Sequence, residues 1–66
     1  MSRYEIRVQG ALSETARTAL GDLRLRALPT ETALVGTVID DAELRGILDL
    51  IADLGLHLVA MQELRE

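Results

Sequence analysis

The sequence predicts an α+β fold in which two helices cover one face of a four-stranded antiparallel sheet. Four segments alternate apolar and polar residues with the period of a strand, and two intervening segments repeat apolar residues every three or four positions. The length of 66 residues admits a single domain spanning residues 1–66. A chain this short has a thin core, which a partner subunit would enlarge.

The first half of the chain contains two predicted strands and a short helix. Residues 4–9 alternate strictly, and Gly10 ends that strand. Ser13 offers a side-chain N-cap to a helix, and Gly21 is expected at its C-terminus in the left-handed conformation. Residues 23–28 alternate again and Pro29 favours a turn, so residues 23–28 and 32–39 are predicted to form a hairpin.

The second helix is the clearest element of the sequence. Asp40 and Glu43 have the spacing of a capping box, and Gly55 is expected to close the helix. Apolar residues recur at helical spacing between these ends, namely at Leu44, Ile47, Leu48, Ile51 and Leu54. Residues 56–61 are predicted as the fourth strand, and residues 62–66 as a polar exit.

This element order is the βαββαβ pattern of the ferredoxin-like sandwich, with strand order 4-1-3-2. Right-handed crossovers place both helices on one face, so the other side, here called the open face, is left uncovered. Alternation assigns to the open face Glu5, Arg7, Gln9, Arg24, Arg26, Leu28, Val35, Thr37, Ile39, His57, Val59 and Met61. The helix-facing set is Tyr4, Ile6, Val8, Leu23, Leu25, Ala27, Leu34, Val38, Leu56, Leu58 and Ala60. Gly36 on that side would allow a helix to approach closely, and a bulge near Val59 would exchange Ala60 and Met61.

The open face supplies the candidate site. Apolar residues ringed by charged ones are typical of an interface, and guanidinium groups suit a carboxylate or phosphate ligand. Arginines in alternate positions also protect an edge strand from pairing. Glu5 on the first strand could pair with His57 across the sheet. The candidate ligand or interface residues are Arg7, Arg24, Arg26, Val35, Thr37, His57, Val59 and Met61.

Composition excludes several classes of function. The formal charge of −4 and the scarcity of aromatic residues disfavour nucleic acid as a partner. No apolar run approaches the length of a membrane span, so a cytoplasmic protein is expected. With no cysteine and one histidine the sequence predicts no metal site, and it contains no cofactor motif and no nucleophile paired with a base.

Two resemblances follow from particular residues. The stretch Thr32-x-Leu34-x-Gly36-x-Val38-x-Asp40, with Leu44-x-Gly46-Ile47-Leu48 and Leu54-Gly55-Leu56-x-Leu58-Val59, resembles short actinobacterial proteins of unknown function. The topology also resembles ACT-type small-molecule-sensing domains, and Gln9-Gly10-Ala11-Leu12 stands where those domains have their strand-to-helix ligand loop. The second resemblance implies a regulatory module.

The predicted function is therefore a non-catalytic homodimerising interaction or small-ligand-binding module. It would associate through its open face or its sheet edges and would take a small anionic or apolar ligand. The alternative is a small enzyme or accessory cyclase that uses a cavity between the two sheets of a dimer, with His57, Arg7 and Glu5 as its polar groups. A third hypothesis is an accessory subunit of a larger protein.

Overall fold

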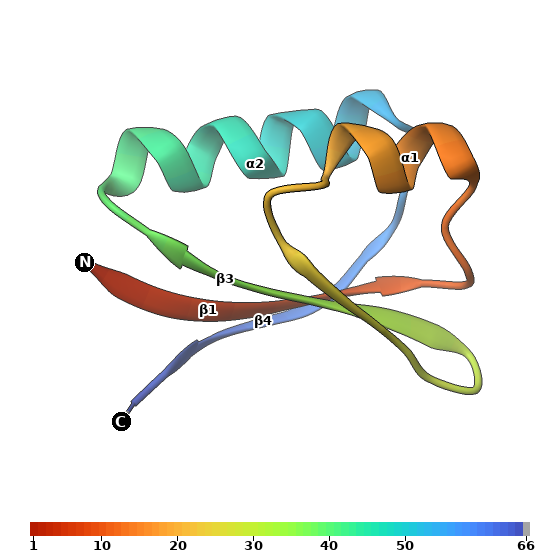
Figure 1. The fold of residues 1–66 in the computed structure, drawn as a ribbon, viewed down its shortest axis with the longest axis horizontal. Helices are drawn as coiled ribbons and strands as arrows, with labels where there is room; N and C mark the ends of the chain where they lie inside the picture. Colours follow the sequence, from red (N-terminus) through yellow and green to blue (C-terminus); the bar gives the residue numbers. More distant parts are fainter. Residues whose placement is uncertain (66) are drawn as a thin grey trace.

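The computed structural model describes residues 1–65 and has the element order β-α-β-β-α-β (Figure 1). The strands and helices, in chain order, are β1 (Ser2–Gln9), α1 (Glu14–Ala19), β2 (Arg24–Ala27), β3 (Glu31–Val38), α2 (Asp41–Asp53) and β4 (Leu58–Leu64). This confirms the predicted α+β class and element order.

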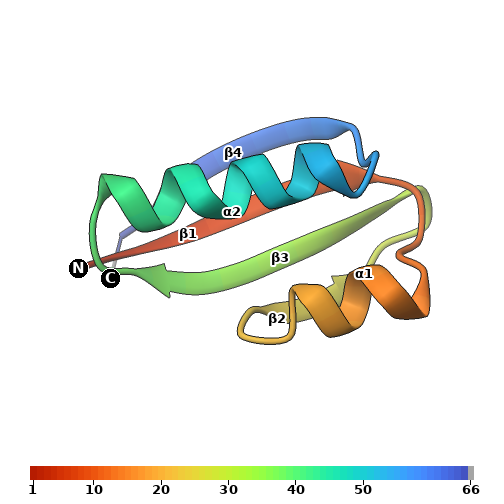
Figure 2. The same cartoon turned by 90° about the horizontal axis from the view of Figure 1, so that it is seen from above.

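The four strands form one open antiparallel sheet in the order β2-β3-β1-β4. The central strands are thus β1 and β3, and counting the same neighbours from the β4 edge gives 4-1-3-2. Both helices lie on the same side of this sheet, as Figures 1 and 2 show from two directions. The expected open face is therefore present on the opposite side.

The core lies between the sheet and the two helices. Its buried apolar cluster joins both central strands to both helices through Ile6, Val8, Leu20, Leu34 and Ile51. Half-buried leucines from α2 and from the loops surround this cluster. The most deeply buried large side chains come from β1 and β3, because these strands have neighbours on both sides.

The first helix is shorter than predicted. Ser13 caps it as expected, since its Oγ accepts a hydrogen bond from the Ala16 amide at 3.2 Å. The left-handed closure expected at Gly21 is wrong, because the helix ends at the C-cap Leu20 and Gly21 does not have a positive φ. The side chain of Leu20 enters the core there, so burial of this side chain rather than a glycine turn accompanies the end of α1.

The ends of α2 follow the prediction. Asp40 Oδ1 accepts from the Glu43 amide at 2.9 Å, and Glu43 Oε1 accepts from the amide of Ile39, one residue before the cap, at 3.0 Å. At the other end Gly55 has a φ of +76° and donates to Ala52, while Leu56 donates to Ile51 at 3.1 Å. This pair of bonds is a Schellman motif, which satisfies the last carbonyls of the helix.

The same motif explains why the last strand was predicted too early. The amide of Leu56 is held by the helix, so β4 cannot begin at residue 56. It begins at Leu58 and continues to Leu64, through residues predicted as a polar exit, because the first half of β1 offers partners as far as Arg3. His57 therefore lies in the connection between α2 and β4, outside the strand.

A bulge at Val59 sets which side chains of β4 face the helices. Arg7 pairs with Ala60 and Val8 with Leu58, so Val59 is the extra residue. Directly opposed residues share a face, and Met61 opposes the buried Ile6. Met61 is thus on the helix side and Ala60 on the open face. Strict alternation predicts the reverse, and the exchange of these two residues is the one expected from a bulge near Val59.

Two further assignments to the open face, and the expectation for Gly36, also need correction. Leu28 and Ile39 lie outside the strands, in the β2–β3 turn and just before the α2 cap. Gly36 does permit a close approach, but the group that meets it is the side chain of Leu23, from the segment before β2, and not a helix.

Candidate functional site

The open face carries its side chains in rows set by the strand register. In one row Arg26 of β2, Ala33 of β3 and Arg7 of β1 lie side by side, and in the next Arg24 and Glu5 flank Val35. A third row pairs Thr37 with Arg3. Small side chains of β3 thus form a floor between arginines on both neighbouring strands. We call this the arginine trough, made of Ala33, Val35 and Thr37 with Arg3, Arg7, Arg24 and Arg26.

The two walls of the arginine trough differ in their ion pairs. On the β1 wall, Arg7 lies 3.9 Å from the carboxylate of Glu5 and 3.7 Å from that of Glu31. Glu5 also accepts a hydrogen bond from Gln62 of β4 at 3.1 Å. On the β2 wall, Arg24 and Arg26 are exposed and make no ion pair within residues 1–65. The uncompensated positive charge therefore lies on β2.

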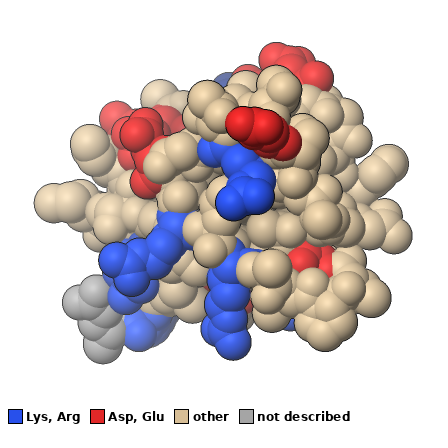
Figure 3. Space-filling view, turned by 45° about the vertical axis from the view of Figure 1, so that its right-hand side comes forward, with Lys and Arg blue, Asp and Glu red and all other residues tan. Residues whose placement is uncertain are grey.

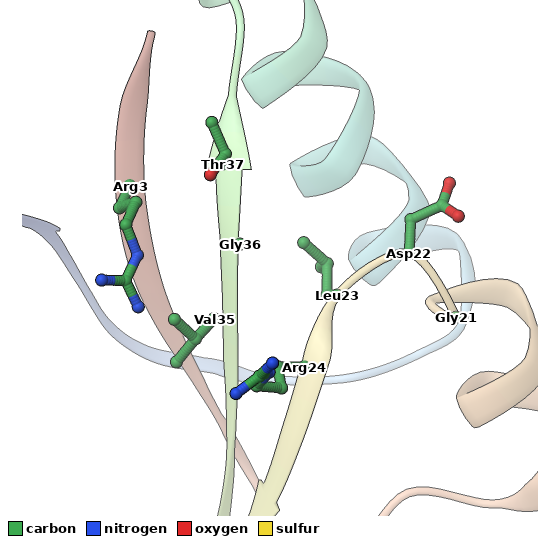
Figure 4. A pocket seen from close by; sticks show the side chains of 8 residues that line it. All are labelled: Arg3, Gly21, Asp22, Leu23, Arg24, Val35, Gly36 and Thr37. Carbon is green, nitrogen blue, oxygen red and sulfur yellow. The ribbon is translucent and has the colours of Figure 1, made fainter.

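The trough is hollowed at the end where β2 begins. A hollow of about 540 Å³, open to solvent, lies there among Arg3, Arg24, Val35 and Thr37, with the segment 21–23 on its far side. In Figure 4 the guanidinium groups of Arg3 and Arg24 stand on either side of Val35. The hollow exists because β2 is only four residues long and its pairing with β3 ends at Arg24 and Val35, so no strand lies beside the rest of β3 at this end.

Charge is divided between the two faces of the molecule. Within residues 1–65, four arginines against two glutamates, Glu5 and Glu31, give the open face a formal charge of +2, on a chain whose total is −4. The two helices carry five carboxylates against two arginines, a formal charge of −3; these residues are Glu14, Asp41, Glu43, Asp49 and Asp53 with Arg17 and Arg45. Figure 3 shows this division, with arginines mainly on the sheet side and carboxylates mainly over the helices.

The outer edge of β4 is the second candidate surface. No strand pairs with that side of β4 in the sheet formed by residues 1–65. Leu58, Val59 and Met61 remain 49%, 47% and 41% exposed, and Leu58 and Met61 are on the helix side, where α2 leaves them half uncovered. An exposed apolar edge of this length is a template for pairing with another strand.

The predicted site residues do not form a single group. Arg7, Arg24, Arg26, Val35 and Thr37 are brought together in the arginine trough. Val59 and Met61 belong instead to the β4 edge. The predicted open face lacked residues at the strand ends, because the prediction started the first and third strands too late and ended the fourth too early; these residues are Arg3, Glu31, Gln62 and Leu64. It also lacked Ala33, although its spacing of two from Val35 could have revealed it, and Ala60, which the bulge at Val59 moves to this face.

His57 lies apart from the groups proposed to work with it. Its side chain is exposed, and its carbonyl accepts a hydrogen bond from the Gln9 amide at 2.9 Å. Glu5, expected as its partner, is bonded to Gln62 and lies near Arg7. Within residues 1–65 no group of three or more His, Asp or Glu side chains is placed to hold a metal ion. Neither α1 nor α2 has the length and apolarity to cross a membrane.

Comparison with known families gives a match over most of the chain. Residues 3–62 match the model of a domain of unknown function, DUF8691. This chain belongs to that family. No curated protein and no solved structure matches it. Membership in the family assigns no activity to the chain.

Proposed function

We propose that this chain is a non-catalytic, cytoplasmic homodimerising module with a ferredoxin-like, ACT-like fold, in which two copies associate along their β4 edges. The observation that carries the proposal is the exposed apolar edge formed by Leu58, Val59 and Met61. β4 contains neither lysine nor proline, two residues by which proteins commonly protect such an edge. Its resemblance to short actinobacterial proteins remains a prediction.

Edge pairing would also complete the core. A two-fold axis perpendicular to the sheet pairs β4 with itself in antiparallel fashion and keeps the helices of both copies on one side. One flank of α2, with Glu43, Ile47 and Leu50, shares a hollow with α1. Leu44, Leu48 and Ala52 are spaced along the other flank, toward β4. In the dimer these flanks would meet above Met61 and remove it from water.

The alternative arrangement, with two open faces stacked on each other, is disfavoured by charge. Each face carries four arginines and a formal charge of +2, so stacking would bring like charges together in an interface that excludes water. The predicted enzyme, which uses a cavity between two sheets, requires this same stacking. The position of His57, exposed and apart from Glu5, gives it no support.

Sedimentation equilibrium of Met61→Lys tests the proposal. A lysine placed mid-strand must lose hydration when another strand pairs with β4, so the dimer dissociation constant should rise at least about tenfold, equivalent to about 1.4 kcal/mol. Val59→Lys should also raise the dimer dissociation constant.

The matched control is Ile39→Lys, which replaces a side chain that is 67% exposed and lies outside β4. It should leave the dimer unchanged. A wild-type chain that is monomeric at all attainable concentrations, or an equal loss of dimer in the control, would contradict the proposal.

A further inference from the structure

We infer that the arginine trough binds an extended acidic segment of a partner protein, with carboxylate side chains of that segment paired to Arg24 and Arg26. The inference is independent of the dimer, because one copy of the chain carries the whole trough. It names a partner class for the open face, which the proposed edge contact leaves uncovered.

Charge complementarity identifies the chemistry of the occupant. The open face is positive on a chain that is negative overall, so it attracts anions while the helix side repels them. All the basic residues of the trough are arginines, whose planar forked guanidinium matches a carboxylate with two hydrogen bonds. Arg24 and Arg26 have no carboxylate partner within residues 1–65, so binding an acidic segment breaks no internal ion pair there.

The shape of the trough favours an extended segment. The floor is open at Val35 and Thr37, where the hollow lies, and is covered at Ala33, which is 1% exposed between Arg26 and Arg7. Arg24 and Arg26 are two residues apart on one strand, which is the spacing of side chains on one side of an extended peptide. A small molecule in the open hollow would keep much of its surface in water, whereas small-ligand pockets usually bury 70–90% of the ligand.

Other anionic occupants fit less well. Nucleic-acid binding by an open sheet uses aromatic side chains that stack on bases, and the only aromatic residue of this chain, Tyr4, opposes Gly36 on the helix side. A second copy stacked through its own open face brings arginine against arginine. An acidic peptide meets neither objection.

NMR titration of the full chain with a peptide in which glutamate alternates with alanine tests the inference. We expect shifts in the amides of residues 33–37 and in the Nε–H signals of Arg24 and Arg26, with saturation below about 5 mM peptide. The same peptide with glutamine in place of glutamate should not bind. Inorganic phosphate and oligouridylate, added separately, should bind more weakly than the acidic peptide.

The decisive comparison is between two double variants of equal charge. Arg24→Gln with Arg26→Gln should weaken peptide binding at least about tenfold, since two charge-assisted contacts are lost. Arg17→Gln with Arg45→Gln removes the same charge from the two helices. This variant should change the dissociation constant of the peptide less than twofold. If the first double variant does not fold, Arg24→Gln alone is compared with Arg17→Gln alone.

Several results would overturn the inference: no saturation by the acidic peptide, equal weakening in both double variants, or tighter binding of phosphate or oligouridylate. Appearance of higher oligomers in the Arg24→Gln, Arg26→Gln variant, with peptide binding intact, would instead assign these arginines to protection of the β2 edge. Met61→Lys should bind the peptide as tightly as the wild type. Failure of the proposed dimer can therefore be distinguished from failure of the proposed peptide binding.

Discussion

Thr32 is the one buried polar side chain in the core of residues 1–65, and it ties two loops together. Its hydroxyl donates to the carbonyl of Gly10 at 2.8 Å, and the Gly10 amide donates to the carbonyl of Thr30 at the same distance. The connection from β1 to α1 is thereby fixed to the turn that joins β2 and β3. The hydrogen bond matters because Thr32 is only 5% exposed, and a buried polar group left without its partner costs free energy.

Thr32→Val keeps the shape of the side chain and removes its hydroxyl. We expect a loss of about 1–2 kcal/mol of unfolding free energy, because the Gly10 carbonyl loses the hydroxyl that donates to it from a side chain that is only 5% exposed. Urea denaturation measures the loss. Equal stability of Thr32→Val and the wild type would mean that water replaces the hydroxyl, against the burial of 95% that the structure gives this residue.

Among the secondary-structure elements, strands and helices could largely be predicted from the sequence because their signals are local. The alternation of residues 4–9 and the cap residues Ser13, Asp40 and Gly55 report on their own segments. The end of β4 could not be predicted, because it depends on a partner far away in the chain: the length of β1 extends the strand to Leu64. Its start is set locally, by the Schellman bond from Leu56 to Ile51, which delays the strand.

The candidate site could be predicted only in part, because strict alternation holds in regular strands and fails beyond a bulge. Arg7, Arg24 and Arg26 were placed together because their strands are regular. Met61 was misplaced, because one extra residue upstream inverts the alternation of a strand. The division between a charged face and an apolar edge only becomes visible once the register of all four strands is known.

Deletion of Val59 tests the role of the bulge in β4. Val59 has no partner on β1, so its removal leaves Ala60 opposite Arg7 and Leu58 opposite Val8, and the register is kept. The edge becomes a regular strand, and regular edges pair more readily than bulged ones. We expect the variant to fold and to self-associate more tightly, as measured by sedimentation. Weaker association, or a shifted β1–β4 register in NMR, would contradict this assignment.

At the scale of the whole molecule, we propose two contacts for two surfaces of different chemistry. In the proposed dimer the apolar β4 edge enlarges the small core of a 66-residue chain, and the charged trough stays exposed after that edge is covered. Association should therefore raise the unfolding temperature with protein concentration, while salt should weaken peptide binding much more than it weakens the dimer.

The contact between two copies can be observed directly in a mixed sample, with one copy isotope-labelled and the other not. Intermolecular nuclear Overhauser effects then report only on pairs of protons from different chains. The account predicts contacts between β4 and β4 of the two copies, with Leu48 and Met61 near the two-fold axis. Intermolecular contacts from Val35 or Arg24 to the same face of the other copy would contradict it.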